Sequence, residues 1–421
     1  MKMFRCVACF FVAAVTVLGC NGVSKRSLSG NDDIRGQLKA LVAADKYSEV
    51  LAVCDEQLKS APSNAELWAY RGMAEFYSGK PEVAKADLLH AISLNPKAFW
   101  YHRELGCIYL DAGKNDEALQ SLTEALKLAP NSEAKAPVHG LMASVLLSLN
   151  EPDKAIYEVG EALKNGPVRP WIYQTRALAY SDLWQDKEAL VDATKCIELD
   201  DKSASAYGLR AEIYLYLGDC ANASADAQKA LSLDKNYWRA KDTLVLIDLT
   251  EGRDKEALKS ADWLIENYPK SVSSYLAKAY CFLAMNDLER ARQMVDKALE
   301  MNGQDTLAIE TAIVVASKRG DRLSTEKLLD RLPKKFTGGT QYSRSRAMAL
   351  LFLKQYGEAI AYCSSIISRE KTCPFLLRVR SEAYRRLGKD ELAVVDMKNA
   401  VAQCYVKKSV LERYLTAASK Y

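Results

Sequence analysis

A spacing of 34 residues recurs through almost the whole chain. It is marked by a small residue, found at Val50, Ala84, Ala118, Ala155, Ala189, Ala223, Ala257, Ala291, Thr325, Ala359 and Ala393. The one irregular step, of 37 residues, runs from Ala118 to Ala155. So constant a choice of a small side chain predicts that two helices cross at this residue, too closely for anything larger than a methyl group. The chain is therefore predicted to be an array of structural repeats.

Two other features follow the same period. Five residues before the alanine position the chain has a residue that favours a left-handed turn at a helix end: Gly79, Gly113, Asn150, Gly218, Gly252, Asn286, Gly320 or Gly388. Acidic residues such as Asp116 and Asp287 follow, where their side chains would satisfy the free amides of a second helix. Proline ends that helix twelve residues after the alanine position, at Pro62, Pro96, Pro130, Pro167 and Pro269. Each repeat is therefore predicted to be helix, tight turn, helix.

These residues resemble the tetratricopeptide repeat family. One unit matches its pattern at Leu105, Gly106, Tyr109, Ala118, Leu122, Ala125 and Pro130, and the preceding unit at Trp68, Gly72, Ala84, Leu88, Ala91 and Pro96. The resemblance covers Asp32 to about Gln403. It implies an all-α solenoid, a right-handed superhelix of about eleven hairpins over residues 34–403, closed by a capping helix at 404–421.

Some units depart from the family pattern. Glu75 stands where an aromatic residue is usual, and Trp184 and Lys354 replace the turn glycine. The unit from Leu307 to Pro333 matches least well and is expected to be slightly irregular.

The resemblance also implies a binding surface for a protein or peptide. In this family the first helices line the concave side, where positions two, five, nine and twelve of each repeat face a ligand. The candidates read from these positions are Met73, Phe76, Trp100, Arg103, Leu110, Trp171, Gln174, Leu178, Glu212, Leu215, Leu246, Tyr280, Leu283, Arg344, Arg378, Glu382 and Arg385. Aromatic residues and arginine dominate the binding energy of protein interfaces. Trp100 and Trp171 are equally compatible with packing between repeats, or with stacking on the sugar rings of a cell-wall glycan. The carboxylate clamp of chaperone-tail binders is not expected, because Cys107 stands where it has asparagine.

The charge of the chain is unevenly distributed. The net charge is only +4, but from Lys318 to Tyr421 there are 22 Lys and Arg against 10 Asp and Glu. This basic end predicts either an anionic partner, such as an acidic protein segment, lipid phosphate or lipopolysaccharide, or simply a solvated helix face. Nucleic acid is not expected, since no aromatic platform accompanies the charge.

The first residues are predicted to be an address signal. Lys2 and Arg5 precede an apolar stretch that is too short to span a bilayer, as in a signal peptide (residues 1–19). The segment ends in Val17-Leu18-Gly19-Cys20, which resembles the lipobox of bacterial lipoproteins and implies lipid attachment at Cys20. Asn21 follows instead of Asp, so the resemblance implies the periplasmic face of the outer membrane. An ordinary secretory signal is the alternative. Residues 20–33 are interpreted as a lipidated cysteine with a flexible tether.

No catalytic or cofactor site is predicted. His90, His102 and His139 lie in different repeats, and there is no glycine-rich phosphate loop, metal motif or nucleophile elbow. Cysteines at inward positions are expected to be buried thiols: Cys54, Cys107, Cys196, Cys281 and Cys363. Cys373 and Cys404 would lie at the same end of one hairpin, where a disulfide can form. The sequence therefore favours a non-catalytic, lipid-anchored scaffold for protein interactions, with a glycan-binding lipoprotein as the alternative.

Overall fold

The computed structural model describes residues 30–149, 151–167, 169–183, 185–332, 341–369 and 373–403. All regular structure in these ranges is α-helical, which confirms the all-α prediction. The first helices of the repeats are α1 (Gly30–Ala43), α3 (Ala65–Tyr77), α5 (Phe99–Asp111), α7 (Ser132–Ser148), α9 (Pro170–Asp182), α11 (Ala204–Tyr216), α13 (Trp238–Thr250), α15 (Val272–Ala284), α17 (Thr306–Lys318), α19 (Gln341–Phe352) and α21 (Pro374–Arg386). The second helices are α2 (Tyr47–Ser60), α4 (Pro81–Leu94), α6 (Asn115–Leu128), α8 (Pro152–Asn165), α10 (Asp186–Leu199), α12 (Cys220–Leu233), α14 (Asp254–Asn267), α16 (Leu288–Met301), α18 (Arg322–Leu329), α20 (Tyr356–Ile367) and α22 (Asp390–Gln403).

Several predictions concern residues outside these ranges. They are the signal peptide (residues 1–19), the lipid attachment at Cys20, the turn residues Asn150 and Trp184, the capping helix at 404–421 and the bridge between Cys373 and Cys404. The predicted tether ends earlier than expected, because α1 begins at Gly30 rather than after Asp33.

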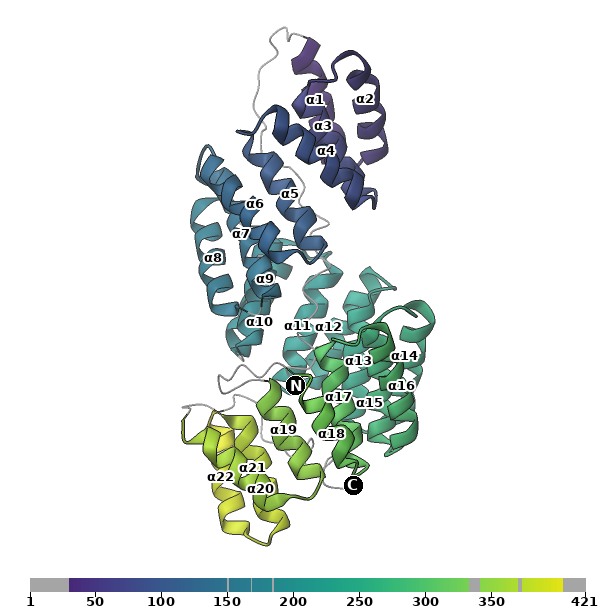
Figure 1. Cartoon of the computed structure of the whole chain (residues 1–421), viewed down its shortest axis with the longest axis vertical. Coiled ribbons are helices and arrows are strands. Elements are labelled where there is room, and N and C mark those ends of the chain that lie inside the picture. Colours follow the sequence, from purple (N-terminus) through teal and green to yellow (C-terminus); the bar gives the residue numbers. More distant parts are fainter. Residues whose placement is uncertain are drawn as a thin grey trace. The chain divides into compact units, whose positions relative to one another are not determined.

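The chain divides into two compact units. The N-terminal unit contains α1 to α9 and the C-terminal unit contains α10 to α22 (Figure 1). In each unit every helix packs against the next one in the chain, and first helices also pack against first helices, as α3 does with α5 and α13 with α15. The second helices make their close contacts with neighbouring first helices. First helices therefore form one layer and second helices the other, as in a solenoid of helical hairpins.

The alanine position is where the two helices of a hairpin meet. Ten of its eleven residues have no exposed surface, and Ala393 is 6 % exposed. Even the two exceptions to alanine, Val50 and Thr325, are fully buried. The predicted close crossing is thus confirmed, because a methyl-sized group leaves the helices in contact without a cavity.

The turn residues adopt the predicted left-handed backbone. Their φ angles lie between 67° and 82° at Gly79, Gly113, Gly218, Gly252, Gly320 and Gly388. Asn286 has φ 57°, and Lys354, which replaces glycine, still adopts φ 60°. The neighbouring helices therefore impose this conformation on a lysine, although a side chain makes it less favourable.

The predicted acidic caps are mostly wrong. Among the second helices from α2 to α20, as far as the structure describes their N-terminal residues, a side chain caps the amides at Asp219, Asp287 and Asp321. Asp116, Asp186 and Asp254 lie one position or more inside their helices, and the residues that precede these helices make no capping bond. Acidic groups in a first turn still interact favourably with the helix dipole, which explains their abundance without a cap.

One repeat differs in length from the others, and another has a shortened second helix. The 37-residue step lengthens the first helix, since α7 has 17 residues and contains Pro137. The unit predicted to be irregular has the shortest helix, α18, with 8 residues. Elsewhere the predicted prolines lie two residues beyond the second helices, as Pro96 does after α4.

The inward cysteines are buried thiols, as predicted. Cys54, Cys107, Cys196, Cys281 and Cys363 are at most 3 % exposed. Burial raises the pKa of Cys54, Cys196, Cys281 and Cys363 to about 12, so these thiols stay protonated at neutral pH. They are packing residues rather than nucleophiles.

Candidate functional site

The candidate site is the surface formed by the first helices within each unit, called here the inner surface. It carries positions two, five, nine and twelve of each repeat. Of the sequence candidates, Phe76, Trp100, Trp171, Gln174, Tyr280 and Arg378 are half-buried there. Stacking of the first helices thus brings side chains of consecutive repeats onto one surface.

Trp171 is a packing residue between repeats. Its ring lies against Gly140 on the preceding first helix, so closely that a Cβ built on Gly140 would be 2.2 Å from the indole Cη2. The indole Nε1 is buried and has no hydrogen-bond partner among the residues that the structure describes. Both observations show that the ring fills space between α7 and α9 instead of standing free for a ligand.

The same arrangement occurs in the C-terminal unit. A Cβ on Gly208 of α11 would be 2.3 Å from the Tyr237 ring, just before α13. Trp100 lies in a comparable place, with its ring centroid 5.2 Å from that of Tyr70 and 4.5 Å from that of Tyr101. Large rings of one repeat thus pack on a small residue or another ring of the preceding repeat.

Five candidates are buried, contrary to the prediction: Met73, Leu110, Leu215, Arg344 and Glu382. Met73 is 4 % exposed and belongs to the cluster around α2 and α3. Arg344 is 8 % exposed, with its guanidinium 5.7 Å from the centre of the Phe375 ring. Positions five and nine of a first helix can be covered by the neighbouring first helix, so the position alone does not guarantee exposure.

Other candidates are held by neighbours within the chain. The Arg103 Nε donates a hydrogen bond to Glu104 at 2.9 Å, and the arginine side chain is 13 % exposed. The Tyr280 hydroxyl lies 3.1 Å from the Thr311 hydroxyl. Contacts within the chain therefore hold Arg103 and Tyr280 in place. Phe76 and Gln174 are partly accessible members of the inner surface in the N-terminal unit.

Four arginines of the basic end are paired with carboxylates of the same segment. Ion pairs of 2.7 to 3.5 Å join its arginines to acidic side chains, in the pairs Arg346–Glu326, Arg380–Asp396, Arg385–Glu382 and Arg386–Glu382. Arg385 is still half exposed. These pairs leave the surplus of basic over acidic residues unchanged, but they hold four of its guanidinium groups against carboxylates of the chain.

A charged cluster that the sequence analysis missed lies on the inner surface of the C-terminal unit. Arg239 on α13 donates two hydrogen bonds, of 2.9 and 3.0 Å, to Glu212 on α11. Asp242, one turn along α13, is half-buried beside this pair. Burial, with the nearby Glu212 carboxylate, raises the pKa of Asp242 to about 7, although Arg239 acts in the opposite direction.

A signal for this cluster was present in the sequence. Arg239 and Asp242 occupy positions two and five of their repeat, and Glu310 occupies position five of another. The rule of positions two, five, nine and twelve, which selected Glu212, also selects Arg239, Asp242 and Glu310. Glu310 is 3 % exposed and accepts a hydrogen bond of 3.0 Å from Ser345.

Neither a metal site nor a membrane span is found in the part of the chain that the structure describes. No three His, Cys, Asp or Glu side chains there lie close enough together to hold a metal ion. None of the described helices combines the length and hydrophobicity needed to cross a membrane. His102 and His139 instead make local bonds, to the Pro96 carbonyl and to Glu158.

Three segments match models of the tetratricopeptide repeat: residues 99–132, 204–237 and 244–306. The chain contains tetratricopeptide repeats. The matched segments lie in both units, and they share their period and turn geometry with the repeats between them.

Similar curated proteins carry the same repeat. The tetratricopeptide repeat and J domain-containing co-chaperone DNJ1 of Mycosarcoma maydis is 26 % identical over 298 residues, which cover 68 % of this chain and 46 % of that protein. The Hsp70-Hsp90 organizing protein 2 of Arabidopsis thaliana is 36 % identical over 85 residues, 20 % of this chain and 15 % of that protein. The chain thus spans less than half the length of these relatives.

A solved structure has a similar fold. The Cut9–Hcn1 hetero-tetramer of the APC/C aligns with a TM-score of 0.56 at 16 % identity, covering 93 % of this chain and 86 % of that one. This likeness supports the tetratricopeptide repeat solenoid and, at such low identity, concerns the fold alone.

Proposed function

We propose that the protein is a non-catalytic scaffold that binds protein or peptide partners on the inner surface of its repeats. The observation that carries this proposal is the stacking of first helices, which aligns side chains of successive repeats on one surface. An extended peptide can contact several repeats at once on such a surface, and each repeat adds a small contribution to the affinity.

The named relatives support this function over catalysis. One is described as a co-chaperone and another as an organizing protein of two chaperones. Both descriptions fit proteins that act by binding other proteins. The buried, protonated cysteines and the locally bonded histidines of this chain leave few groups suited to nucleophilic or acid–base chemistry.

Glycan binding is less well supported than peptide binding. That alternative depends on tryptophan rings with free faces, on which sugars could stack. The Trp171 ring packs on Gly140, and Trp100 packs against Tyr70 and Tyr101. Neither ring stands apart from the core, so neither provides the open platform that a sugar needs.

Site-specific photo-crosslinking tests the proposed surface. A benzoylphenylalanine in place of Gln174, half-buried on α9, is expected to cross-link a protein in intact cells. The matched control replaces Gln120, an exposed glutamine on α6 in the layer of second helices of the same unit. Protein adducts at Gln174 but not at Gln120 are expected. Equal adducts at both positions, or none at Gln174, would contradict the proposal.

We further propose that the scaffold is held at the bacterial cell envelope, at the outer membrane, by a lipid on Cys20. The support is the lipobox-like sequence that ends at this cysteine. A diacylglyceryl group binds membranes through its acyl chains, each buried CH₂ contributing about 0.8 kcal/mol.

Replacing Cys20 with alanine is expected to abolish fatty-acid labelling and to release the protein from the membrane fraction. The reason is that the thiol is the atom to which the lipid would be attached. Metabolic labelling with an alkyne fatty acid, followed by fractionation, measures both effects. Cys54→Ala serves as the control, since Cys54 is a fully buried repeat residue. Unchanged labelling of the Cys20→Ala protein would rule out the anchor.

A further inference from the structure

A bridge made by arginine recurs between the helices of several repeats. The arginine is at position seven of a first helix and binds an aspartate at position 23, on the second helix of the same repeat. In three repeats of the described chain two hydrogen bonds of 2.6 to 2.9 Å join them, in the pairs Arg71–Asp87, Arg210–Asp226 and Arg380–Asp396. These guanidinium groups also lie within 4.3 to 6.0 Å of the centres of neighbouring aromatic rings.

The third nitrogen of the arginine can reach the preceding second helix. Arg71 Nη1 donates to Asp55 at 3.2 Å, and Arg380 Nη1 donates to Ser364 at 2.8 Å. Both acceptors occupy position 25 of the preceding repeat. The bridge therefore connects two adjacent second helices through one guanidinium group, with a carboxylate on one side and a carboxylate or hydroxyl on the other.

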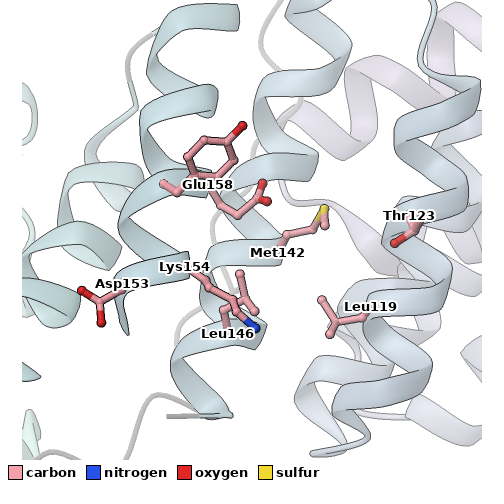
Figure 2. Close-up of a pocket in the computed structure, with 8 residues that line it drawn as sticks. Leu119, Thr123, Met142, Leu146, Asp153, Lys154 and Glu158 are labelled. Atoms are coloured by element: carbon pink, nitrogen blue, oxygen red, sulfur yellow. The ribbon is translucent and has the colours of Figure 1, made fainter. Parts of the chain in front are cut away.

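The repeat formed by α7 and α8 keeps the acceptors but lacks the arginine. Position seven is Met142, position 23 is Glu158, and position 25 of the preceding repeat is Thr123. All three residues line one cavity of about 490 Å³ between α6, α7 and α8 (Figure 2). The cavity thus occupies the place that an arginine side chain fills in other repeats.

The remaining residues complete a pocket for a cation with an apolar stem. Leu119, Leu146 and Tyr157 also line the cavity, and Tyr157 is 66 % exposed. Lys154 also lines the cavity, and its charge is paired with Glu151 at 2.6 Å. Asp153 adds a second carboxylate to the lining. The lining is therefore apolar, with a surplus of negative charge.

Glu158 retains capacity to bind a guest. His139 Nδ1 lies 2.7 Å from its Oε2, while Oε1 has no hydrogen-bond partner among the described residues. The glutamate side chain is 16 % exposed. A partly buried carboxylate with an available oxygen favours a cationic donor, because a charge-assisted hydrogen bond gains strength away from bulk water.

We propose that this cavity is a docking site for an arginine side chain of a partner protein. The guest guanidinium would donate to Glu158 and to the Thr123 hydroxyl, as Arg380 does to Asp396 and Ser364. The cavity between α6, α7 and α8 uses none of the repeat positions that form the inner surface, so it is a second binding site for the scaffold and does not depend on the first.

The placement of the two acceptors favours arginine over lysine. Where position seven is lysine, at Lys278, position 23 is Met294, and the ammonium pairs only with Asp262, at position 25 of the preceding repeat, among the described residues. In the cavity position 25 is a threonine, whereas the carboxylate is at position 23, which arginine binds in three repeats. A planar guanidinium can bind both acceptors at once, which a single ammonium group cannot do with the same geometry.

Methyl NMR of the full chain can test this site directly. The probe is N-acetyl-arginine N-methylamide, and the signal is the ¹³C-labelled methyl group of Met142. We expect a saturable shift with a Kd in the millimolar range, which is typical of a single side chain. The citrulline analogue keeps the shape but lacks the charge, and it should cause no saturable shift. The lysine analogue should bind at least about 5-fold more weakly.

Variants connect the binding to the cavity. Glu158→Gln is expected to abolish the shift, whereas Glu161→Gln, one turn along the same helix and paired with Lys164, should leave it unchanged. Met142→Arg should rebuild the bridge internally and eliminate probe binding, which ligand-observed NMR can follow without the Met142 signal. Circular dichroism and the unfolding midpoint verify that each variant is folded.

Three results would contradict the docking of an arginine side chain in this cavity. A response to the citrulline analogue equal to that of the arginine probe would show that charge is not recognised. Unchanged binding by folded Glu158→Gln would show that the probe binds elsewhere. Equal affinity for the lysine analogue would overturn the assignment to arginine. None of these outcomes bears on cross-linking at Gln174, so the two sites are tested separately.

Discussion

Replacing Gly140 with alanine is expected to destabilise the N-terminal unit by about 1–3 kcal/mol. The added Cβ would lie 2.2 Å from Cη2 and 2.6 Å from Cζ3 of Trp171. A planar indole packed between α7 and α9 cannot bend away from this contact, so the ring or a helix must shift. Denaturant unfolding followed by tryptophan fluorescence measures the loss as a lower midpoint.

A matched glycine and a second substitution identify the cause. Gly160 lies inside α8 with nothing within 4 Å of its added Cβ. Gly160→Ala should therefore be neutral or stabilising by up to about 1 kcal/mol, as alanine favours a helix. In a Trp171→Ala background, Gly140→Ala should cost far less than in the native chain. If Gly140→Ala and Gly160→Ala have equal effects, the close contact is not important.

Asp242→Asn is expected to stabilise the C-terminal unit increasingly as the pH rises. The pKa of Asp242 is raised from 3.8 to about 7, so between these values the folded chain retains a proton that the unfolded chain has lost. Stability contributed by the neutral carboxyl is therefore present at low pH and is lost as the pH approaches 7. Asparagine stays neutral, so the variant should gain about 2–4 kcal/mol over the native chain at pH 8 and almost nothing at pH 4.

The groups that face Asp242 determine the sign of this effect. Glu212 from α11 repels a second negative charge, Arg239 on the same helix attracts one, and Cys281 on α15 is a protonated thiol. Urea unfolding at pH 4, 6 and 8 measures the difference between native and variant chains. Asp296→Asn, on an exposed side chain of α16, is the control and should change stability by less than about 1 kcal/mol at each pH. A constant difference for Asp242→Asn would contradict the expected titration.

Sequence reasoning predicted the repeat unit well because its signals are local. A left-handed turn needs glycine or asparagine, and a close helix crossing needs alanine, so both requirements recur at fixed spacing. Lys354 shows the limit of such signals, since packing of the flanking helices imposes φ 60° on a residue that does not favour it. The acidic residues were misassigned as caps because the helix dipole attracts them to the whole first turn.

The candidate site was predicted less well, because exposure depends on the neighbouring repeat. Counting positions placed Met73 and Arg344 on the binding surface, yet both are buried. Four arginines of the basic end, Arg346, Arg380, Arg385 and Arg386, are paired with carboxylates that lie 3, 4, 16 or 20 residues away in sequence. The consequence of Met142 at the arginine position became apparent only when three residues, from three helices, were found around one cavity.

By itself, the sequence determined that this protein is a chain of helical hairpins, since a 34-residue period fixes where each helix turns and where two helices touch. Tertiary structure alone decided which side chains of each hairpin are accessible and which charges are compensated. The physical reason is that the next hairpin, whose side chains lie about 34 residues away, either covers a given face of a hairpin or leaves it accessible. Position in a repeat therefore predicts backbone geometry, whereas recognition depends on contacts between repeats.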